Sequence, residues 1–241
     1  MPPVTLAIAS EHVTLLPQRA AYWHERETLL LTDLHLGKVE TFAAYGVPLP
    51  DVMTRQLAAL QALLNVFRPR RVLILGDLLH APAGLTETML EQVRAWREGS
   101  GCEFSVVPGN HDRHLEKVGR WWNMRVLPER HDEGPFTFLH EPTHVAGRFV
   151  FAGHVHPVVK LRTSVDTLKL WCFVVDSPDG ALNSGVCTLP AFCDFTSGGT
   201  VDVRVAGRQV WAIAEGEVLP IQSAQSTGPR NAARAERPQR A

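Results

Sequence analysis

The chain has 241 residues, of which 45% are hydrophobic and 20% charged, and its formal net charge is −1. This length suffices for one large domain with its own buried core. Because the net charge is near zero, the overall charge does not predict binding to nucleic acid or to a membrane. We expect no membrane partner, because no apolar run approaches the roughly 18 residues of a membrane-spanning helix and the N-terminus lacks the features of a secretion signal.

The cysteines favour a cytoplasmic location. Their spacing contains no C-x-x-C pair, and each lies in an apolar, strand-like stretch. They are Cys102, Cys172, Cys187 and Cys193. Such a pattern indicates reduced, buried thiols and disfavours a disulfide framework or a thiolate zinc site.

The first half of the chain alternates buried strands with amphipathic helices. An apolar strand at 28–31 precedes a helix at 51–67 whose apolar residues recur at helical spacing and which Arg68-Pro69 ends. The stretch RRVLILGD restarts a strand, a helix at 87–99 follows with Thr86 as its cap, and CEFSVVPGN forms a third strand. This order predicts an α/β fold.

From about Pro135 the pattern becomes mostly β. The predicted strands are PFTFLH, GRFVFAGH, VVKLR, KLWCFVV and a closing pair, VDVRVAG and RQVWAIAEG. Because no linker separates the two halves, we expect two sheets that share one core in a single domain at 1–221.

Residues 222–241 have almost no core-forming side chains and predict a disordered basic tail. Its arginines are Arg230, Arg234, Arg237 and Arg240, against the single acid Glu236. An inert, solvated end is the favoured interpretation, and a role in holding nucleic acid is the alternative.

Ligand-type side chains follow the predicted strands. They occur as Asp33-x-His35, Gly76-Asp77, Gly109-Asn110-His111-Asp112, Leu139-His140 and Gly153-His154-Val155-His156. Because the carboxyl ends of neighbouring parallel strands face a common crevice, these residues are expected to converge. In an extended chain, residues two apart also project to the same side. The side chains of Asp33 and His35 would therefore point to one common site, as would those of His154 and His156.

The donor set points to a pair of divalent metal ions. It combines carboxylate, amide and imidazole donors without thiolate, which suits Mn²⁺ best in our interpretation, with Fe, Zn or Co as alternatives. Seven donors are too many for one such ion, and they divide over two ions about 3.5–4 Å apart, an arrangement suited to phosphoryl transfer. A lone D-x-H or G-D is more often a surface turn or a helix cap, but GNHD and GHVH are much more specific.

In this order the motifs resemble the calcineurin-like metallophosphoesterase superfamily over roughly residues 28–195. The resemblance implies a four-layer α-β-β-α sandwich of two mixed sheets. It implies that Asp33, His35 and His156 hold one metal, that Asn110, His140 and His154 hold the other, and that Asp77 bridges them. His111 would act on the scissile phosphate or its leaving oxygen, and Asp112 would orient it. The usual Gly-His motif is Leu139-His140 here, with His144 as a rival ligand.

Three longer stretches narrow the resemblance to the bacterial ligase-associated DNA damage response endonucleases. They are DLHLGKVETFAAYGVPLP, GHVHPVV and LPAFCDFTSGG. This branch implies DNA as substrate and action beside a DNA ligase, a helicase and an exonuclease-like partner.

The candidate substrate contacts lie close to the metal motifs. They are Lys38, Asn110, His111 and Arg113. A basic, aromatic rim after GNHD is the wider candidate, composed of Arg113, His114, Lys117, Arg120, Trp121, Trp122 and Arg125. A solvated helix face with two core tryptophans explains that run equally well.

The sequence therefore predicts a dimetal-dependent phosphodiesterase, a DNA endonuclease of DNA repair in which a metal hydroxide attacks the phosphodiester. The alternatives are a phosphoesterase for a nucleotide or another small molecule and a non-catalytic repair scaffold. The remaining histidines of interest, His24, His80, His114 and His131, are expected at the surface or behind the ligands, with His80 near enough to approach substrate.

Overall fold

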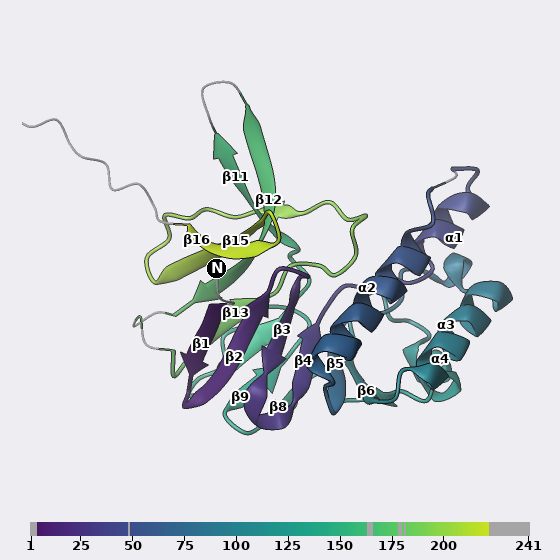
Figure 1. Cartoon of the computed structure of the whole chain (residues 1–241), viewed down its shortest axis with the longest axis horizontal. Helices are drawn as coiled ribbons and strands as arrows, with labels where there is room; N and C mark the ends of the chain where they lie inside the picture. The colour runs from purple at the N-terminus through teal and green to yellow at the C-terminus, as the bar shows by residue number, and fades with distance from the viewer. Residues whose placement is uncertain (1–3, 48, 163–165, 178–179, 181, 222–241) are drawn as a thin grey trace, which may run out of the picture.

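The computed structural model describes residues 4–47, 49–162, 166–177, 180 and 182–221. Figure 1 shows two β-sheets, with the helices gathered on one side of the first. The predicted tail at 222–241 lies outside the described residues.

The first sheet has seven strands that lie in chain order. They are β1 (Val4–Ile8), β2 (Glu11–Leu16), β3 (Ala20–Trp23), β4 (Thr28–Leu31), β5 (Arg71–Leu75), β6 (Glu103–Val107) and β7 (Arg125–Val126). Strands β1 to β4 run antiparallel to their neighbours, and β4 to β7 run parallel. The parallel half is the predicted α/β unit, whereas strands β1 to β3 were not predicted.

The helices connect the parallel strands and cover the outer face of this sheet. They are α1 (Lys38–Ala44), α2 (Val52–Phe67), α3 (Glu87–Gly99) and α4 (Leu115–Trp121), with short 3₁₀ turns η1 (His24–Arg26) and η2 (Pro82–Gly84). The Asp51 carboxylate accepts the Thr54 N–H at the start of α2, and the Thr86 hydroxyl accepts the Met89 N–H at the start of α3. Both helices lie where the sequence predicted them.

The second sheet has nine strands. They are β8 (His131–Glu133), β9 (Phe136–Phe138), β10 (Phe149–Ala152), β11 (Pro157–Arg162), β12 (Thr167–Asp176), β13 (Gly185–Thr188), β14 (Gly199–Thr200), β15 (Arg208–Ala214) and β16 (Glu217–Ile221). Their order is β14-β11-β12-β13-β10-β9-β8, and the β15-β16 hairpin pairs with β12.

One predicted strand, VDVRVAG at 201–207, is wrong. The segment forms turns, because the Asp202 carboxylate accepts the Arg204 N–H and Gly207 adopts a left-handed backbone. The closing hairpin therefore consists of β15 and β16.

Aromatic rings fill the space between the two sheets. Trp23 of β3 packs edge-on against Phe136 with ring centroids 4.9 Å apart, and Phe151 lies 5.0 Å from Phe136. All of these side chains are fully buried. The two mixed sheets thus share one apolar core, as expected from the sequence.

The layers are a helical layer, the first sheet and the second sheet. Among the described residues no α-helix follows Trp121, so in this part of the chain the second sheet has no helical layer on its outer face. No helix among the described residues is long and apolar enough to cross a membrane.

Replacing Phe151 tests the aromatic core. Phe151→Ala removes a fully buried ring and should lower the free energy of unfolding by about 3–5 kcal/mol. Chemical denaturation of both proteins measures the difference. The control Val66→Ala, at a side chain that is 74% exposed, should change stability by less than about 0.5 kcal/mol. Equal stabilities of the two variants would contradict this packing.

Candidate active site

Five chain segments bring the predicted metal ligands to one edge of the two sheets. Three follow the parallel strands β4, β5 and β6 of the first sheet, and two follow β9 and β10 of the second. The parallel direction of these strands explains the convergence, since their carboxyl ends lie at the same edge.

The first half-site consists of Asp33, His35 and His156. Asp33 Oδ1 lies 3.1 Å from His156 Nε2, and His35 Nε2 lies 3.5 Å from the same nitrogen. Asp33 and His35 are buried, and His156 is half-buried. Three donor atoms from both sheets therefore face one point.

The second half-site consists of Asn110, His140 and His154. Asn110 Oδ1 lies 3.0 Å from His140 Nε2 and 3.1 Å from His154 Nδ1. The two imidazole nitrogens are 3.1 Å apart. This cluster also joins the two sheets.

Asp77 lies between the half-sites. Its Oδ2 is 3.4 Å from His140 Nε2 and 4.0 Å from His35 Nε2. Its Oδ1 accepts the backbone N–H of His111 at 2.9 Å. The carboxylate therefore has one oxygen fixed by the backbone and the other directed at both clusters.

The ligand pairs do not converge through the extended geometry that the sequence analysis assumed. Strand β4 ends at Leu31 and β10 ends at Ala152, before the ligands begin. The ligands Asp33, His35, Asp77, His154 and His156 all have left-handed backbones, with φ between 48° and 68°. The predicted extended geometry is therefore wrong, and a strained backbone orients these side chains.

Backbone hydrogen bonds hold the strained segments together. The Asp33 N–H donates to the Gly76 carbonyl and the His35 N–H to the Asp77 carbonyl, so the β4-β5 pairing continues beyond the strands. Across the sheets, the His154 N–H donates to Asp33 Oδ2 at 3.1 Å.

Two glycines allow the segments to approach one another. A Cβ at Gly76, where φ is 83°, would overlap the His140 ring, and a Cβ at Gly153 would overlap the Thr32 hydroxyl. Any larger residue would push a ligand from its place.

Thr32 is a supporting residue that the sequence analysis missed. It is fully buried, and its hydroxyl lies 2.9 Å from Asp33 Oδ2 and 2.8 Å from the Leu75 carbonyl oxygen. A hydroxyl at the end of an otherwise apolar run, directly before a ligand, was the available signal, because a buried hydroxyl needs a hydrogen-bond partner.

The electrostatics of the second half-site favour a cation at His140. Its Nδ1 donates to the Leu75 carbonyl, so Nε2 faces acceptor atoms of Asn110 and Asp77. Although burial opposes protonation, the bond and charge of Asp77 raise the pKa of His140 to about 9. Burial likewise opposes the Asp77 charge, yet His140 helps to lower the pKa of Asp77 to about 2. A metal ion at Nε2 would supply the positive charge that a proton otherwise supplies.

The first half-site also fits a metal ion. Asp33 Oδ1 and His35 Nδ1 are buried and make no hydrogen bond with any described group. Burial lowers the pKa of His35 to about 3, which keeps the imidazole neutral, the form that binds metal. Metal-competent groupings include Asp33 with His35 and His156, and Asp33 with Asp77 and His140. The donors are oxygen and nitrogen atoms, as expected for Mn²⁺, Fe²⁺, Co²⁺ or Zn²⁺.

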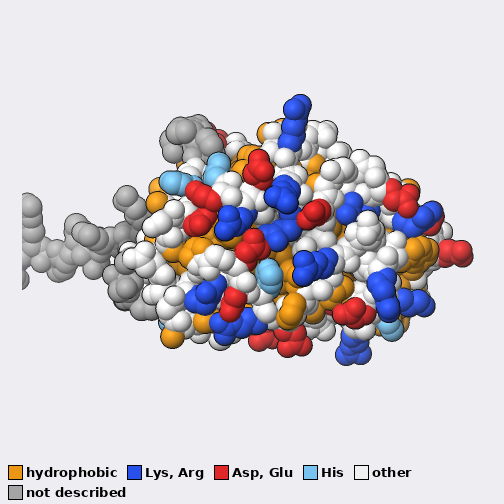
Figure 2. All heavy atoms as spheres, turned by 90° about the horizontal axis from the view of Figure 1, so that it is seen from below, with side chains coloured by type: hydrophobic (Ala, Val, Ile, Leu, Met, Phe, Trp, Pro, Cys, Tyr) orange, Lys and Arg blue, Asp and Glu red, His pale blue; other side chains and the backbone are white. Residues whose placement is uncertain are grey.

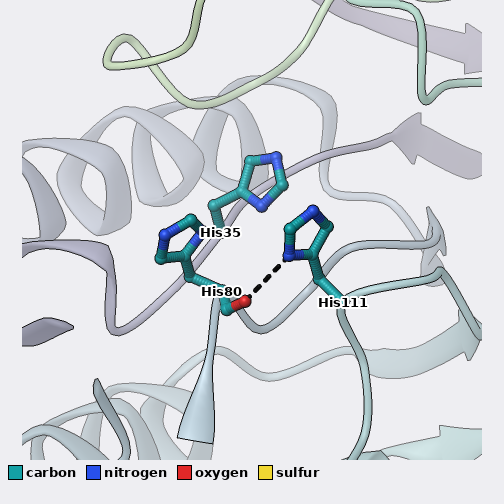
Figure 3. Close-up of side chains that lie close together, drawn as sticks. All are labelled: His35, His80 and His111. Atoms are coloured by element: carbon teal, nitrogen blue, oxygen red, sulfur yellow. Dashed lines mark hydrogen bonds between the residues drawn. The ribbon is translucent and has the colours of Figure 1, made fainter. Parts of the chain in front are cut away.

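A third histidine, His80, joins His35 and His111 beside the first half-site (Figure 3). The His80 and His111 rings stack with centroids 5.6 Å apart, and His111 Nδ1 donates to the His80 carbonyl oxygen at 3.0 Å. His111 Nε2 lies 4.0 Å from Asp77 Oδ2. The His80 carbonyl thus fixes the ring of His111 with Nε2 near the bridging carboxylate.

Asp112 does not orient His111, contrary to the role implied by the resemblance. Its two carboxylate oxygens accept the backbone N–H groups of Leu79 and Gly109, at 2.8 and 2.9 Å. Burial raises the pKa of Asp112 to about 6. Asp112 therefore ties the β5 and β6 loops together and supports the site through the backbone.

Two predicted substrate contacts flank the cluster. Lys38 begins α1 beside His35, and its Nζ lies 5.9 Å from the ring centroid of Phe195. Burial lowers the pKa of Lys38. Arg113 is exposed and follows Asp112 directly.

The predicted basic rim does not form one belt around the site. Helix α4 starts near the ligand edge, but Arg125 pairs with Ser105 in the middle of β6 and lines a cavity with Arg71 and Glu103, the first residues of β5 and β6. Trp122 is buried in the core, whereas Trp121 is 43% exposed. Only Arg113 and His114, at the start of this run, lie beside the ligands in the chain.

A cavity of about 450 Å³ adjoins the second half-site. Its lining residues are Pro108, Gly109, Asn110, Glu129, Arg130, Leu139, His140, Glu141 and Thr143. The rival ligand His144 lines a different cavity, next to Asp176 and Arg208. Of the two histidines His140 and His144, the cluster therefore contains only His140.

Two of the other histidines considered from the sequence, His24 and His131, make their contacts away from the ligands. His24 bonds to the Thr14 hydroxyl, and His131 lies 3.3 Å from Glu133. His114 precedes α4 and is exposed.

Comparisons with known proteins agree with this geometry. A family model described as calcineurin-like phosphoesterase matches residues 27–173. The crystal structure of the nuclease MPE from Pseudomonas putida covers 91% of this chain and 100% of its own, with 32% identity and a TM-score of 0.76. Comparison with curated proteins gave no match.

Two further solved structures resemble the chain weakly. The phosphoesterase Yfce of E. coli has 11% identity, covers 78% of this chain and 88% of its own, and gives a TM-score of 0.39. Vps29 of Entamoeba histolytica, complexed with zinc, has 12% identity. It covers 80% of this chain and 96% of its own, with a TM-score of 0.36. Neither supports an argument about this chain. From the family match and the Pseudomonas relative, the chain belongs to the calcineurin-like phosphoesterase family and is a metal-dependent phosphoesterase.

Proposed function

We propose that the chain is a DNA endonuclease that hydrolyses phosphodiester bonds at a two-metal centre. The observation that carries the proposal is Asp77, whose Oδ2 lies within 4.0 Å of a histidine nitrogen in each half-site. Two ions held on either side of a shared carboxylate suit in-line displacement at phosphorus.

The ligand assignment follows the two clusters. Asp33, His35 and His156 would hold one ion, and Asn110, His140 and His154 would hold the other. Asp77, between the two clusters, would offer its carboxylate to both. When bound, the ions would polarise the phosphate oxygens and offset the negative charge that develops during attack by water. No protein nucleophile is required.

His111 is the residue that meets the substrate. Its side chain is 42% exposed, and its Nδ1–H is committed to the His80 carbonyl, which leaves Nε2 toward the reacting phosphate. Protonated at Nε2, the ring donates a hydrogen bond or a proton to the leaving oxygen. His80 is a positioning residue for that ring.

The side of the first half-site suits a nucleic-acid chain. A row of aromatic rings extends from His111 through His80 and Phe42 to Phe195, whose side chain is 42% exposed. Stacking of a base on such a ring contributes roughly 1–3 kcal/mol. Lys38 beside Phe195 and the exposed Arg113 add positive charge for neighbouring phosphates.

The opposite side is less suited to a polyanion. Glu129 and Glu141 border the cavity beside the second half-site, against one arginine, Arg130. We therefore place the DNA path over Lys38 and Phe195. The relative from Pseudomonas putida, named as a nuclease, supports the choice of a nucleic acid over a small phosphate ester.

The cellular part of the proposal rests on the resemblance found in the sequence. It comprises a role in DNA repair beside a DNA ligase, a helicase and an exonuclease-like partner, in the cytoplasm. All four cysteines are free thiols in the structure, which suits a reducing compartment.

Asp77→Asn tests the bridge. The amide keeps an oxygen for the His111 N–H but removes the charge that both half-sites share, so kcat should fall by about 10²–10³-fold with the fold retained. Steady-state cleavage and circular dichroism are the measurements. The control Asp132→Asn removes the same charge at an exposed position of β8 and should keep full activity. Full activity of Asp77→Asn would contradict the bridged centre.

A matrix of metals and substrates tests the substrate class. Purified protein, stripped with EDTA, should be inactive and should recover with Mn²⁺, cleaving DNA as well as bis(p-nitrophenyl) phosphate. Mononucleotides should react poorly, because their phosphate is a monoester. Cleavage of the model diester with plasmid and single-stranded DNA left intact would instead favour a small-molecule phosphoesterase.

A further inference from the structure

A two-stranded ribbon projects from the second sheet. It consists of β11 (Pro157–Arg162) and the first half of β12, Thr167 to Trp171, and Figure 1 shows it extending beyond the body of the molecule. Strand β15 pairs with β12 only from Cys172 onward, so the ribbon lies beyond that hairpin.

One face of the ribbon is basic. Lys160 and Lys169 are directly opposite each other, and Arg162 is opposite Thr167. All three charged side chains are exposed, and no ion pair joins them to an acid among the described residues. Like charges in direct cross-strand register destabilise a sheet, so this arrangement calls for a polyanion that offsets the repulsion.

The basic face is the one that faces the first sheet. Side chains alternate along β12, and Phe173 and Val175 lie in the core between the sheets. Trp171 and Lys169 share their side of the strand, while Leu170 packs in a separate apolar cluster on the other side.

The ribbon begins at the active site. His156 of the first half-site immediately precedes Pro157, where β11 starts. At about 3.4 Å per residue, Lys160 lies roughly 14 Å along the strand from His156, about the axial length of four nucleotides. At its base, Arg19 lies over the Trp171 ring, 5.7 Å from its centroid.

Several basic residues elsewhere pair with acids. Arg71 pairs with Glu133 at 2.9 Å, and Arg130 pairs with Asp132 at 2.9 Å. Figure 2 shows positive and negative side chains interspersed over the face seen from below. The ribbon bears one described acid, Asp166, near its tip, against three basic side chains.

We propose that the basic face of the ribbon binds the phosphodiester backbone of DNA a few nucleotides from the scissile bond. The inference rests on the proposed function and extends it, because it assigns a positioning surface outside the metal centre. Lys160 and Lys169 each contact a phosphate, and Arg162 extends the contact toward the tip.

Charge reversal separates this role from catalysis. In Lys160→Glu/Lys169→Glu, KM for a long single-stranded oligonucleotide should rise roughly tenfold, and the slope of log KM against log salt should fall by about 1.4, about 0.7 per lost contact. Cleavage of bis(p-nitrophenyl) phosphate should stay unchanged, since it is too small to reach the ribbon. Arg70→Glu, a charge reversal at an exposed residue immediately before β5, is the control and should leave both reactions unchanged.

The single variant Lys160→Glu adds a stability test. It places opposite charges across the ribbon, so its Tm should equal or exceed that of the unaltered protein while its KM for DNA rises. Lys160→Gln/Lys169→Gln repeats the test without new charge and should also raise KM for DNA.

The outcomes distinguish the two proposals. An unchanged KM for DNA in both double variants would overturn the ribbon inference alone. Equal losses of cleavage activity on DNA and on the model diester, in both double variants, would also overturn it. Failure of the unaltered protein to cleave DNA, with the model diester cleaved, would overturn the proposed function and this inference with it.

Discussion

The left-handed backbone at five ligand residues is the constraint on which the site depends. Asp33, His35, Asp77, His154 and His156 each carry a side chain in a conformation that costs about 1–2 kcal/mol for an L-residue. Such strain persists only where the surroundings fix it. Here the backbone of each sheet bonds to the ligand segments of the other, as in the bond from the His154 N–H to Asp33.

This constraint links the packing of the buried core to the geometry of the active site. The aromatic contacts between the sheets fix the separation of β4 and β10, and the strained turns then direct side chains from both toward common points. The resulting clusters gather acceptor atoms at about 3.0–3.5 Å from one another, and the Asp77 carboxylate raises the pKa of His140. A cation relieves that crowding, so metal binding and the stability of the edge are linked.

The sequence was sufficient to predict the helices and strands with regular periodicity and to predict which residues form the site. Helices α2 and α3 carry their caps in the chain, and all seven predicted ligands converge because parallel strand ends must meet. It was insufficient where tertiary contacts decide. Two ligands are two residues apart in the sequence whether the backbone is extended or left-handed, so the sequence could not predict the left-handed turn at Asp33. Asp112 adjoins His111 in sequence but bonds to the backbone of Leu79, and the carbonyl that orients His111 belongs to His80.

The most direct test of the account is a titration of metal-free protein with Mn²⁺, followed by electron paramagnetic resonance. The account predicts two bound ions per chain with an exchange-coupled spectrum, because ions sharing one carboxylate lie about 3.5–4 Å apart. In Asp77→Asn the coupling should be lost. Binding of a single ion, or of two ions with uncoupled spectra in the unaltered protein, would contradict the bridged centre.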